Sequence, residues 1–322
     1  MGDDADVDVD LNLLRQSARE FLTERTESNS VKELAAMDWT GLLVDEELGG
    51  SGWRPVETAV VAEELGRAHD RSTWFGGVMA AAALSSAPEK LRERWLPALL
   101  GGTVTAGVTI VEDVVSVVGG DQVDVIVTLG RNGIHLIEPS DGHKRWLDDD
   151  LLDVTRAVWC VDIAKAPSVL IGSPERADQL LAVARLLLSA DSVGAVSMAL
   201  QRLTTYLKDR MAFGAPIASF QTVQHRLVDL LVFEVKARAI VMKAARAAAS
   251  KDELTTTLSA VAHGFVAAKA TAAVDECMQL SGGIGFTWEY PLHHELRRVF
   301  TNAQLLGTAR SSRALLAETS GW

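Results

Sequence analysis

Four residues in the C-terminal half of the sequence have the chemistry needed to hold a phosphate group. Arg210 carries a fixed, forked cation whose geometry suits a pyrophosphate. Gly282, Gly283 and Gly285 have no Cβ, so the backbone there can approach a phosphate or a ribose closely. Together these residue types could hold a phosphate or a ribose.

Three further residues near them could complete such a site. Gln221 and Gln279 each offer both a hydrogen-bond donor and an acceptor, and Phe213 offers an apolar face. Each residue taken alone could be structural, with Arg210 in a surface ion pair, Phe213 in the core and the glycines in a loop between helices. The ordered set of all of them favours binding.

The histidines and cysteines do not predict a metal site or a catalytic nucleophile. His225 is expected to make a structural hydrogen bond. His293 and His294 are adjacent, whereas a helical metal pair needs ligands at i and i+4, so we expect two solvated side chains. Cys160 and Cys277 lie far apart and outside any CxxC motif, which is typical of inert thiols in a cytoplasmic protein.

Composition limits the classes of protein that this chain can belong to. It has 322 residues, of which 48% are hydrophobic, enough for a large core and more than one domain. With 31 Lys and Arg against 43 Asp and Glu, its formal charge of -12 argues against binding nucleic acid. No basic segment precedes an apolar stretch at the start, and charges interrupt the longest apolar runs. We therefore expect a cytoplasmic protein with no membrane segment and no membrane partner.

The elements that must position these residues are mainly helical, with a small β insert. Residues 1–102 show helical periodicity and predict an N-terminal helical domain. Residues 103–172 are rich in β-branched residues in short runs and predict a small antiparallel β domain. Residues 173–322 return to the helical period and predict a four-helix bundle. Its helices are expected at Ala177–Met211, Thr222–Ser250, Leu254–Ser281 and about 291–318.

Three stretches of the sequence resemble the acyl-CoA dehydrogenase family. Gly41–Gly52 (GLLVDEELGGSG) is similar to a segment of the family's N-terminal helical domain. Arg210–His225 (RMAFGAPIASFQTVQH) and Gln279–Pro291 (QLSGGIGFTWEYP) are similar to two long motifs of its C-terminal domain. The matches extend over nearly the whole chain, and the helix, β, helix order agrees with the family's architecture.

The resemblance implies an enzyme class that oxidises an acyl-CoA thioester to the 2,3-enoyl-CoA. In the family, a carboxylate removes the α-proton, FAD accepts the β-hydrogen as hydride, and an electron-transfer flavoprotein takes the electrons. Each FAD lies across a subunit interface, where one subunit holds the flavin ring and its neighbour holds the adenosine diphosphate end. The residues that the resemblance assigns to that second task are Arg210, Phe213, Gln221, Gln279, Gly282 and Gly283.

The sequence departs from the family at both positions known to carry the catalytic base. Most members have a glutamate before a Gly-Thr dipeptide, which here is Gly307-Thr308, preceded by Leu306. A minority carry the base earlier, at the position that a gap-free count from Arg210 places at Ala184. Neither side chain can accept a proton, and losing a base lowers the rate on the order of a hundredfold or more.

The β region also departs from the family. Where the family has a Glu-Pro-Gly-Ala-Gly-Ser-Asp-like loop that helps cradle the flavin, this chain reads VTIVEDVVSVV over Val108–Val118. The region is also about half as long as the resemblance implies. We therefore expect the half of the site that holds the flavin ring to be degraded, while the half that holds a neighbour's nucleotide is kept.

These two observations favour the non-catalytic subunit of a heteromeric (α2β2) dehydrogenase. It resembles actinobacterial enzymes that dehydrogenate steroid side-chain CoA thioesters, in which a partner chain would supply the glutamate. One alternative is a self-sufficient homo-oligomeric dehydrogenase with an unrecognised base, such as Glu289 or Asp191. Another is a non-enzymatic scaffold that binds no flavin.

Overall fold

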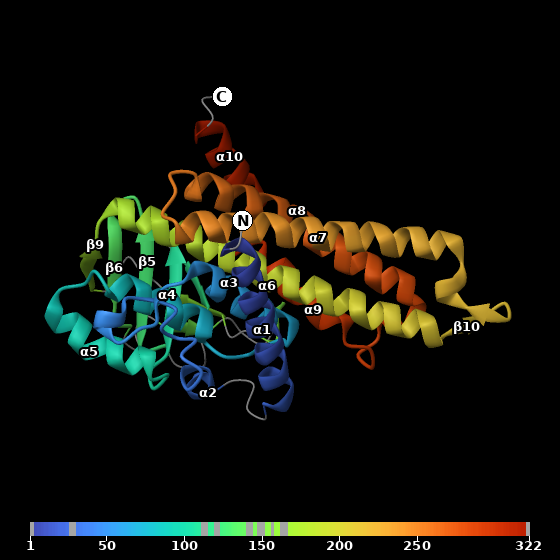
Figure 1. The fold of residues 1–322 in the computed structure, drawn as a ribbon. Helices are drawn as coiled ribbons and strands as arrows, with labels where there is room; N and C mark the ends of the chain where they lie inside the picture. The colour runs from blue at the N-terminus through green and yellow to red at the C-terminus, as the bar shows by residue number, and fades with distance from the viewer. Residues whose placement is uncertain are drawn as a thin grey trace.

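The computed structural model describes residues 3–25, 30–110, 115–118, 123–139, 144–146, 152–155, 158–161 and 167–319. The N-terminal part is mainly helical, as predicted (Figure 1). It consists of α1 (Asp3–Glu24), α2 (Val31–Ala35), β1 (Leu43–Val44), η1 (Glu46–Leu48), β2 (Gly52–Trp53), α3 (Pro55–Arg67), α4 (Trp74–Leu84) and α5 (Glu89–Leu100).

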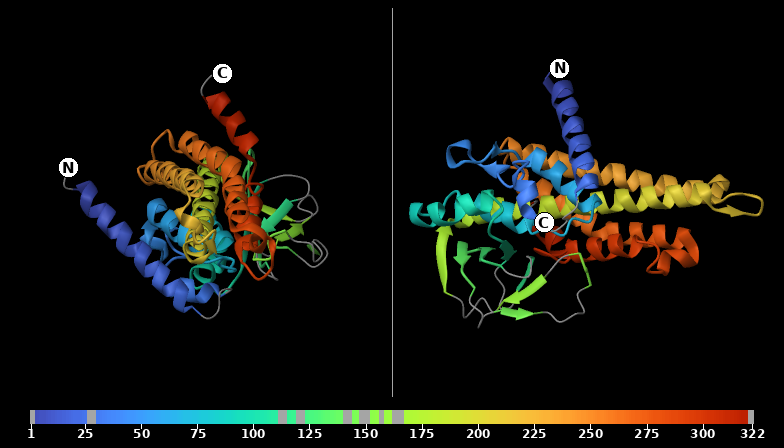
Figure 2. Two further views of the ribbon diagram at one scale, coloured as in Figure 1. Left: turned by 90° about the vertical axis from the view of Figure 1, so that its right-hand side faces the viewer. Right: turned by 90° about the horizontal axis from the view of Figure 1, so that it is seen from below.

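The β region forms two small sheets on one side of the helices, opposite α1 (Figure 2). The first has the order β3 (Ala106–Ile110), β5 (Val125–Gly130), β6 (Gly133–Ile137) and β9 (Ser168–Gly172). The second has the order β4 (Val115–Val118), β8 (Val158–Val161) and β7 (Lys144–Trp146). The prediction of a purely antiparallel region is wrong for one pair, because β3 and β5 are parallel. The reason is that β4 joins the second sheet, so the chain re-enters the first sheet in its original direction.

The C-terminal part contains three long helices that lie side by side, followed by two shorter ones (Figure 1). The elements are α6 (Pro174–Asp209), β10 (Met211–Ala212), β11 (Ala215–Pro216), η4 (Ile217–Ser219), α7 (Gln221–Ala249), α8 (Thr255–Ser281), η5 (Gly282–Phe286), α9 (Leu292–Asn302) and α10 (Ala309–Thr319). The single last helix expected over 291–318 is two helices. The turn between them has positive φ values at Leu306 (55°) and Gly307 (106°), which end the helical path.

Helix α6 is the central element of the core, with α3, α7, α8 and α9 packed around it. Two helices, Pro174–Asp209 and Thr255–Phe286, are long and apolar enough to cross a membrane by length and composition alone, and 50% of the apolar window of the second is buried in the structure. In the structure, 83% of the apolar window of α6 is buried, as in the core helix of a globular bundle.

Helices α3 and α6 cross at a close contact between two glycines. A Cβ added to Gly66 would lie 2.0 Å from the carbonyl oxygen of Asp191, and one added to Gly194 would lie 1.8 Å from that of Glu63. Both neighbours are backbone atoms of a packed helix. The crossing therefore requires glycine at both positions.

A buried ion pair joins α9 to α6 beside this crossing. The guanidinium of Arg298 donates to both carboxylate oxygens of Asp191, at 2.9 and 2.6 Å, and also to the backbone carbonyl of Asp70 at 2.8 Å. The side-chain amide of Asn302 donates to Asp191 at 2.7 Å. Burial opposes the charge on Arg298, but the carboxylate of Asp191 keeps the pKa of this guanidinium above its ordinary value.

A second buried carboxylate, Glu295, has weaker partners. It is fully buried, with Nε of Arg202 at 3.3 Å and Nε2 of His69 at 3.5 Å from Oε1. Burial raises the pKa of Glu295 to about 7, although the charge of Arg202 opposes this shift. Burial, with Arg298 second, lowers the pKa of His69 to about 3, so this imidazole is neutral at neutral pH.

Replacing Gly194 by alanine is expected to destabilise the protein by about 1–3 kcal/mol, because the added methyl group must displace the backbone of α3. Urea unfolding measures the free energy of unfolding. Gly77→Ala is the matched control: Gly77 is also in a buried helix, but its Cβ would meet nothing within 4 Å. Alanine there should be neutral or stabilise by up to about 1 kcal/mol. Equal effects at both sites would contradict the close crossing.

Glu295→Gln is expected to make stability less sensitive to pH. The pKa of Glu295 is raised from 4.5 to about 7, so the folded protein binds this proton more tightly than the unfolded chain. The resulting stabilisation is complete below about pH 4.5 and is lost as the pH rises through about 7. The variant should therefore gain stability relative to wild type between about pH 5 and 8, by up to about 3 kcal/mol.

This difference is measured by urea unfolding of variant and wild type at several pH values in that range. The neutral His69 contributes the opposite slope only below about pH 6.5, so the measurements above that pH report on Glu295 alone. Glu289→Gln, at an exposed glutamate, is the control for removing a surface charge. A pH-independent difference between Glu295→Gln and wild type would refute the raised pKa of Glu295.

Candidate functional site

Arg210 and Phe213 lie at the far end of the long helices, where a hairpin projects beyond the bundle (Figure 1). Arg210 ends α6, is exposed, and pairs with no carboxylate of the described residues. Phe213 is at the tip of the β10–β11 hairpin and is 100% exposed. Phe213 and Gly214 form a tight two-residue turn, with positive φ values of 53° and 82°. Glycine adopts this conformation readily, which favours it at position 214.

The other predicted nucleotide-binding residues lie at the start of α7 and the end of α8. Gln221 is the first residue of α7, Gln279 is in the last turn of α8, and both side chains are exposed. Gly282 follows α8 with a φ of 69°, a backbone conformation that favours glycine.

Packing within the chain explains one of the glycines after α8 but not another. A Cβ on Gly285 would lie 2.5 Å from the carbonyl oxygen of Met278, so packing within the chain explains this glycine. A Cβ on Gly283 would meet nothing within 4 Å, and the φ of Gly283 is not positive. No contact in the described part of the chain therefore requires glycine at 283, which leaves its backbone open to an outside group.

These residues form two groups on the same end of the bundle, since α6 and α8 end there and α7 begins there (Figures 1 and 2). Within the described ranges, no hydrogen bond or ion pair links the hairpin group to the group at the end of α8. Their assignment to a nucleotide stays a prediction. Their exposure fits a site that is completed by another molecule.

The structure brings the two expected base positions together. Ala184 lies in the N-terminal third of α6 and is fully buried, and Leu306 lies in the α9–α10 turn and is 6% exposed. Arg185, next to Ala184, donates a hydrogen bond from Nε to the carbonyl oxygen of Leu306 at 2.8 Å. Arg185 therefore links the segments that carry the two positions, and neither Ala184 nor Leu306 can accept a proton.

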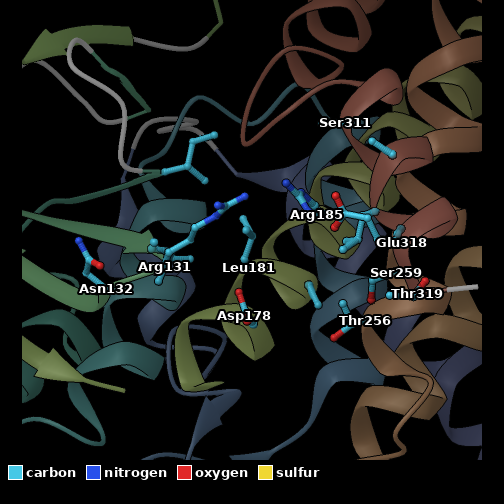
Figure 3. Close-up of a pocket in the computed structure, with 17 residues that line it drawn as sticks. Arg131, Asn132, Asp178, Leu181, Arg185, Thr256, Ser259, Ser311, Glu318 and Thr319 are labelled. Atoms are coloured by element: carbon cyan, nitrogen blue, oxygen red, sulfur yellow. The ribbon is translucent and has the colours of Figure 1, made fainter. Parts of the chain in front are cut away.

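A cavity of about 790 Å³ opens beside this location, between the first sheet, α6, α8 and α10 (Figure 3). Its polar lining includes Arg131, Asp178, Arg185, Ser259 and Glu318. Sequence reasoning did not single out any of these as a site residue, because they come from four separate elements and share no motif. Burial lowers the pKa of the Arg185 guanidinium, and the charge of Asp178 opposes this shift.

The residues considered as alternative bases lie elsewhere. The carboxylate of Asp191 is 6% exposed and is held by Arg298 and Asn302, so it is a structural group. Glu289 is exposed in the turn before α9. Neither residue lines the cavity.

The histidine pair is not solvated as predicted. His293 and His294 are half-buried. The ring centroids of His293 and Trp288 are 4.4 Å apart, and Nδ1 of His293 lies 3.1 Å from the carbonyl oxygen of Tyr290. Among the described residues, no group of three or more His, Cys, Asp or Glu could hold a metal ion. His225 is exposed, so its expected structural hydrogen bond stays a prediction.

The described residues cover only part of two sequence predictions, which concern the inert cysteines and the Val108–Val118 segment. Cys277 is a buried free thiol whose pKa is raised to about 12 by burial, as expected of an inert cysteine. The side chain of Cys160 lies outside the description, and so do residues 111–114 of the Val108–Val118 segment.

Comparisons with known proteins agree with this architecture. The acyl-CoA dehydrogenase N-terminal domain matches residues 10–103, and the acyl-CoA dehydrogenase C-terminal domain matches residues 175–321. The fold superposes on a structure described as the Tcur3481-Tcur3483 steroid ACAD G363A variant, with a TM-score of 0.82 and 22% identity over 97% of this chain and 98% of that one. Butyryl-CoA dehydrogenase from Megasphaera elsdenii gives a TM-score of 0.79 and 20% identity over 97% and 98% of the two chains.

Relatives at higher identity carry the same family name. Acyl-CoA dehydrogenase IpdE2 of Mycolicibacterium smegmatis is 32% identical over 86% of this chain and 83% of its own length. IpdE2 of Mycobacterium tuberculosis is 33% identical over 84% and 79%. With the mainly helical fold and small β domain in place, these matches show that the chain belongs to the acyl-CoA dehydrogenase family of FAD-dependent enzymes.

Proposed function

We propose that this chain is the non-catalytic subunit of a heteromeric acyl-CoA dehydrogenase, assembled with a partner chain that supplies the catalytic glutamate. The proposal rests on which residues occupy the positions where the family carries its catalytic base. Neither Leu306 nor Ala184 carries a proton acceptor, and Arg185, next to Ala184, donates to the Leu306 carbonyl. A guanidinium cannot remove a proton from carbon at neutral pH, because its ordinary pKa lies far above 7.

The chain's own contribution would be to hold the adenosine diphosphate end of an FAD. Bound FAD supplies the hydride acceptor of the family's reaction. Arg210, with no described partner, would pair with its pyrophosphate, and the open backbone at Gly283 would allow close approach of the same group. Phe213, Gln221, Gln279 and Gly282 are exposed around them and would contact the nucleotide.

An exposed apolar row on α7 supports the presence of a partner subunit. Val228, Leu231, Val232 and Val235 recur at helical spacing on one face, with exposed fractions of 54%, 49%, 42% and 54%. A contiguous apolar face of this kind is typical of a protein interface. It lies on the helix that begins at Gln221, so a subunit packed there would be next to the nucleotide-binding residues.

The names of related proteins support the finer proposal. The superposed steroid ACAD carries a double name, Tcur3481-Tcur3483, which fits an enzyme built from two different chains. On this analogy we propose an α2β2 assembly, a steroid side-chain CoA thioester as substrate and an electron-transfer flavoprotein as electron acceptor.

A second candidate function is a self-sufficient homo-oligomeric dehydrogenase. The observation in its favour is that two exposed carboxylates, Asp178 and Glu318, line the cavity beside the base location. The chain purified alone distinguishes the two candidates. A yellow protein that oxidises acyl-CoA, and that loses this activity on Asp178→Asn or Glu318→Gln, would refute the heteromer.

Arg210→Ala is expected to weaken FAD binding about tenfold in the co-expressed assembly, because a charge-assisted contact to phosphate is lost. Flavin absorbance per assembly, measured over an FAD titration, reports the effect. Arg71→Ala removes an exposed arginine elsewhere and should leave flavin content unchanged. Unchanged FAD affinity in Arg210→Ala would favour a purely structural role for the motif, and hence the scaffold alternative.

Leu306→Glu is expected to create no second active site. The new carboxylate would lie beside Arg185, which would hold its pKa low, and the flavin ring would still be held by the partner chain. Turnover per assembly, measured with saturating acyl-CoA, should equal that of wild type. A doubling of turnover would show that this chain retains a working ring site.

A further inference from the structure

The cavity beside the base location presents a cation at the place where the family's chemistry needs a base. Arg185 lies half-buried in its wall, with Nε committed to the Leu306 carbonyl. Its remaining guanidinium donors form no ion pair with any carboxylate in the described part of the chain. A charge so placed is screened less by water than a surface charge and interacts more strongly with a bound ion.

A second cation reaches the same space from the opposite wall. Arg131 extends from the turn between β5 and β6, and Figure 3 shows its side chain pointing toward Arg185 across the cavity. Arg131 is exposed and makes no hydrogen bond or ion pair with any described residue. Two guanidinium groups that face one another, neither in an ion pair with a described carboxylate, can share one anionic group.

The cavity also contains a buried hydroxyl without a partner. Ser259, at the start of α8, is fully buried and lines the cavity, and no described residue hydrogen-bonds its Oγ. Buried hydroxyl groups are normally hydrogen-bonded, because leaving one unpaired costs about 1–3 kcal/mol. A polar group of a ligand could satisfy it.

The rest of the lining is mainly apolar. The aliphatic side chains come from both sheet and helices: Ile110, Leu129, Leu181, Ala182, Ala260, Ala314 and Leu315. The cavity volume of about 790 Å³ lies within the range of about 300–1,000 Å³ that small-molecule sites occupy. A ligand that fits this lining therefore combines an anionic head with an apolar body.

We infer that this cavity binds a hydrophobic carboxylate as an intact ligand, with its head between Arg185 and Arg131 and its body against the aliphatic walls. A carboxylate matches the planar fork of a guanidinium in geometry and charge. Asp178 and Glu318 also line the cavity, but both are exposed, so solvent weakens their repulsion of the ligand. The proposal does not depend on whether the chain binds part of an FAD.

The experiment uses the full-length chain and octanoate labelled with ¹³C at its carboxyl carbon, titrated and followed by NMR. Saturable binding should shift the carboxyl resonance. Arg131→Gln and Arg185→Gln should each weaken octanoate binding about tenfold, equivalent to about 1.4 kcal/mol. Arg131 is exposed and makes no hydrogen bond or ion pair with any described residue, so Arg131→Gln tests the head-group site even if Arg185→Gln disturbs the fold.

Two further ligands separate this proposal from other occupants of the cavity. 1-Octanol, which has the same apolar body without a charge, should bind at least about tenfold more weakly than octanoate to wild type. Coenzyme A alone should not compete with octanoate. Equal binding of octanol and octanoate, competition by coenzyme A, or octanoate affinity unchanged in both arginine variants would each overturn the proposal.

If the chain is obtained only with its partner, the same titration compares wild-type, Arg131→Gln and Arg71→Gln assemblies, because the partner's own sites are common to all three. The Arg131 variant alone should then lose one class of octanoate site, and no loss would overturn the inference. Flavin content is measured on the same samples and should not change. A loss of octanoate binding with unchanged flavin separates this site from the proposed nucleotide clasp.

Discussion

The ion pair between Arg298 and Asp191 fixes the parts of the molecule on which both candidate sites depend. It holds α9 against the middle of α6, and the Arg298 contact to the Asp70 carbonyl adds the end of the α3 segment. The η5 loop with Gly282 and Gly283 precedes α9, and the turn with Leu306 follows it. Because the pair is buried, loss of one partner would leave an uncompensated charge in the core, which typically costs about 3–5 kcal/mol.

Sequence reasoning located the helices well where one periodic pattern extends over many residues. The helix expected over Thr222–Ser250 is observed at Gln221–Ala249, because its apolar spacing is uninterrupted. The break at Leu306 and Gly307 was missed, since a left-handed leucine has no sequence signature. The parallel pairing of β3 and β5 was missed because strand direction depends on which sheet the intervening strand joins.

The two candidate sites also differ in how much of each the sequence predicted. Motifs contiguous in sequence pointed to Arg210, Phe213 and Gln279, and the structure places all three on the exposed end of the bundle. The cavity could not be predicted, because Arg131 and Arg185 are brought together only by packing of the sheet on α6. The absence of a base was visible in sequence at two separate positions. The hydrogen bond by which Arg185, next to Ala184, holds the Leu306 carbonyl was visible only in the fold.

The apolar row on α7 has a consequence for the life of this protein in the cell. Val228, Leu231 and Val235 face water in the single chain. They form an apolar surface that is prone to non-specific association until another chain covers it. If the chain assembles as proposed, unpaired copies would be retained by chaperones or degraded, and the amount of this chain would follow the supply of the proposed partner. Balanced synthesis of the two chains, rather than turnover number alone, would then set how much active enzyme accumulates.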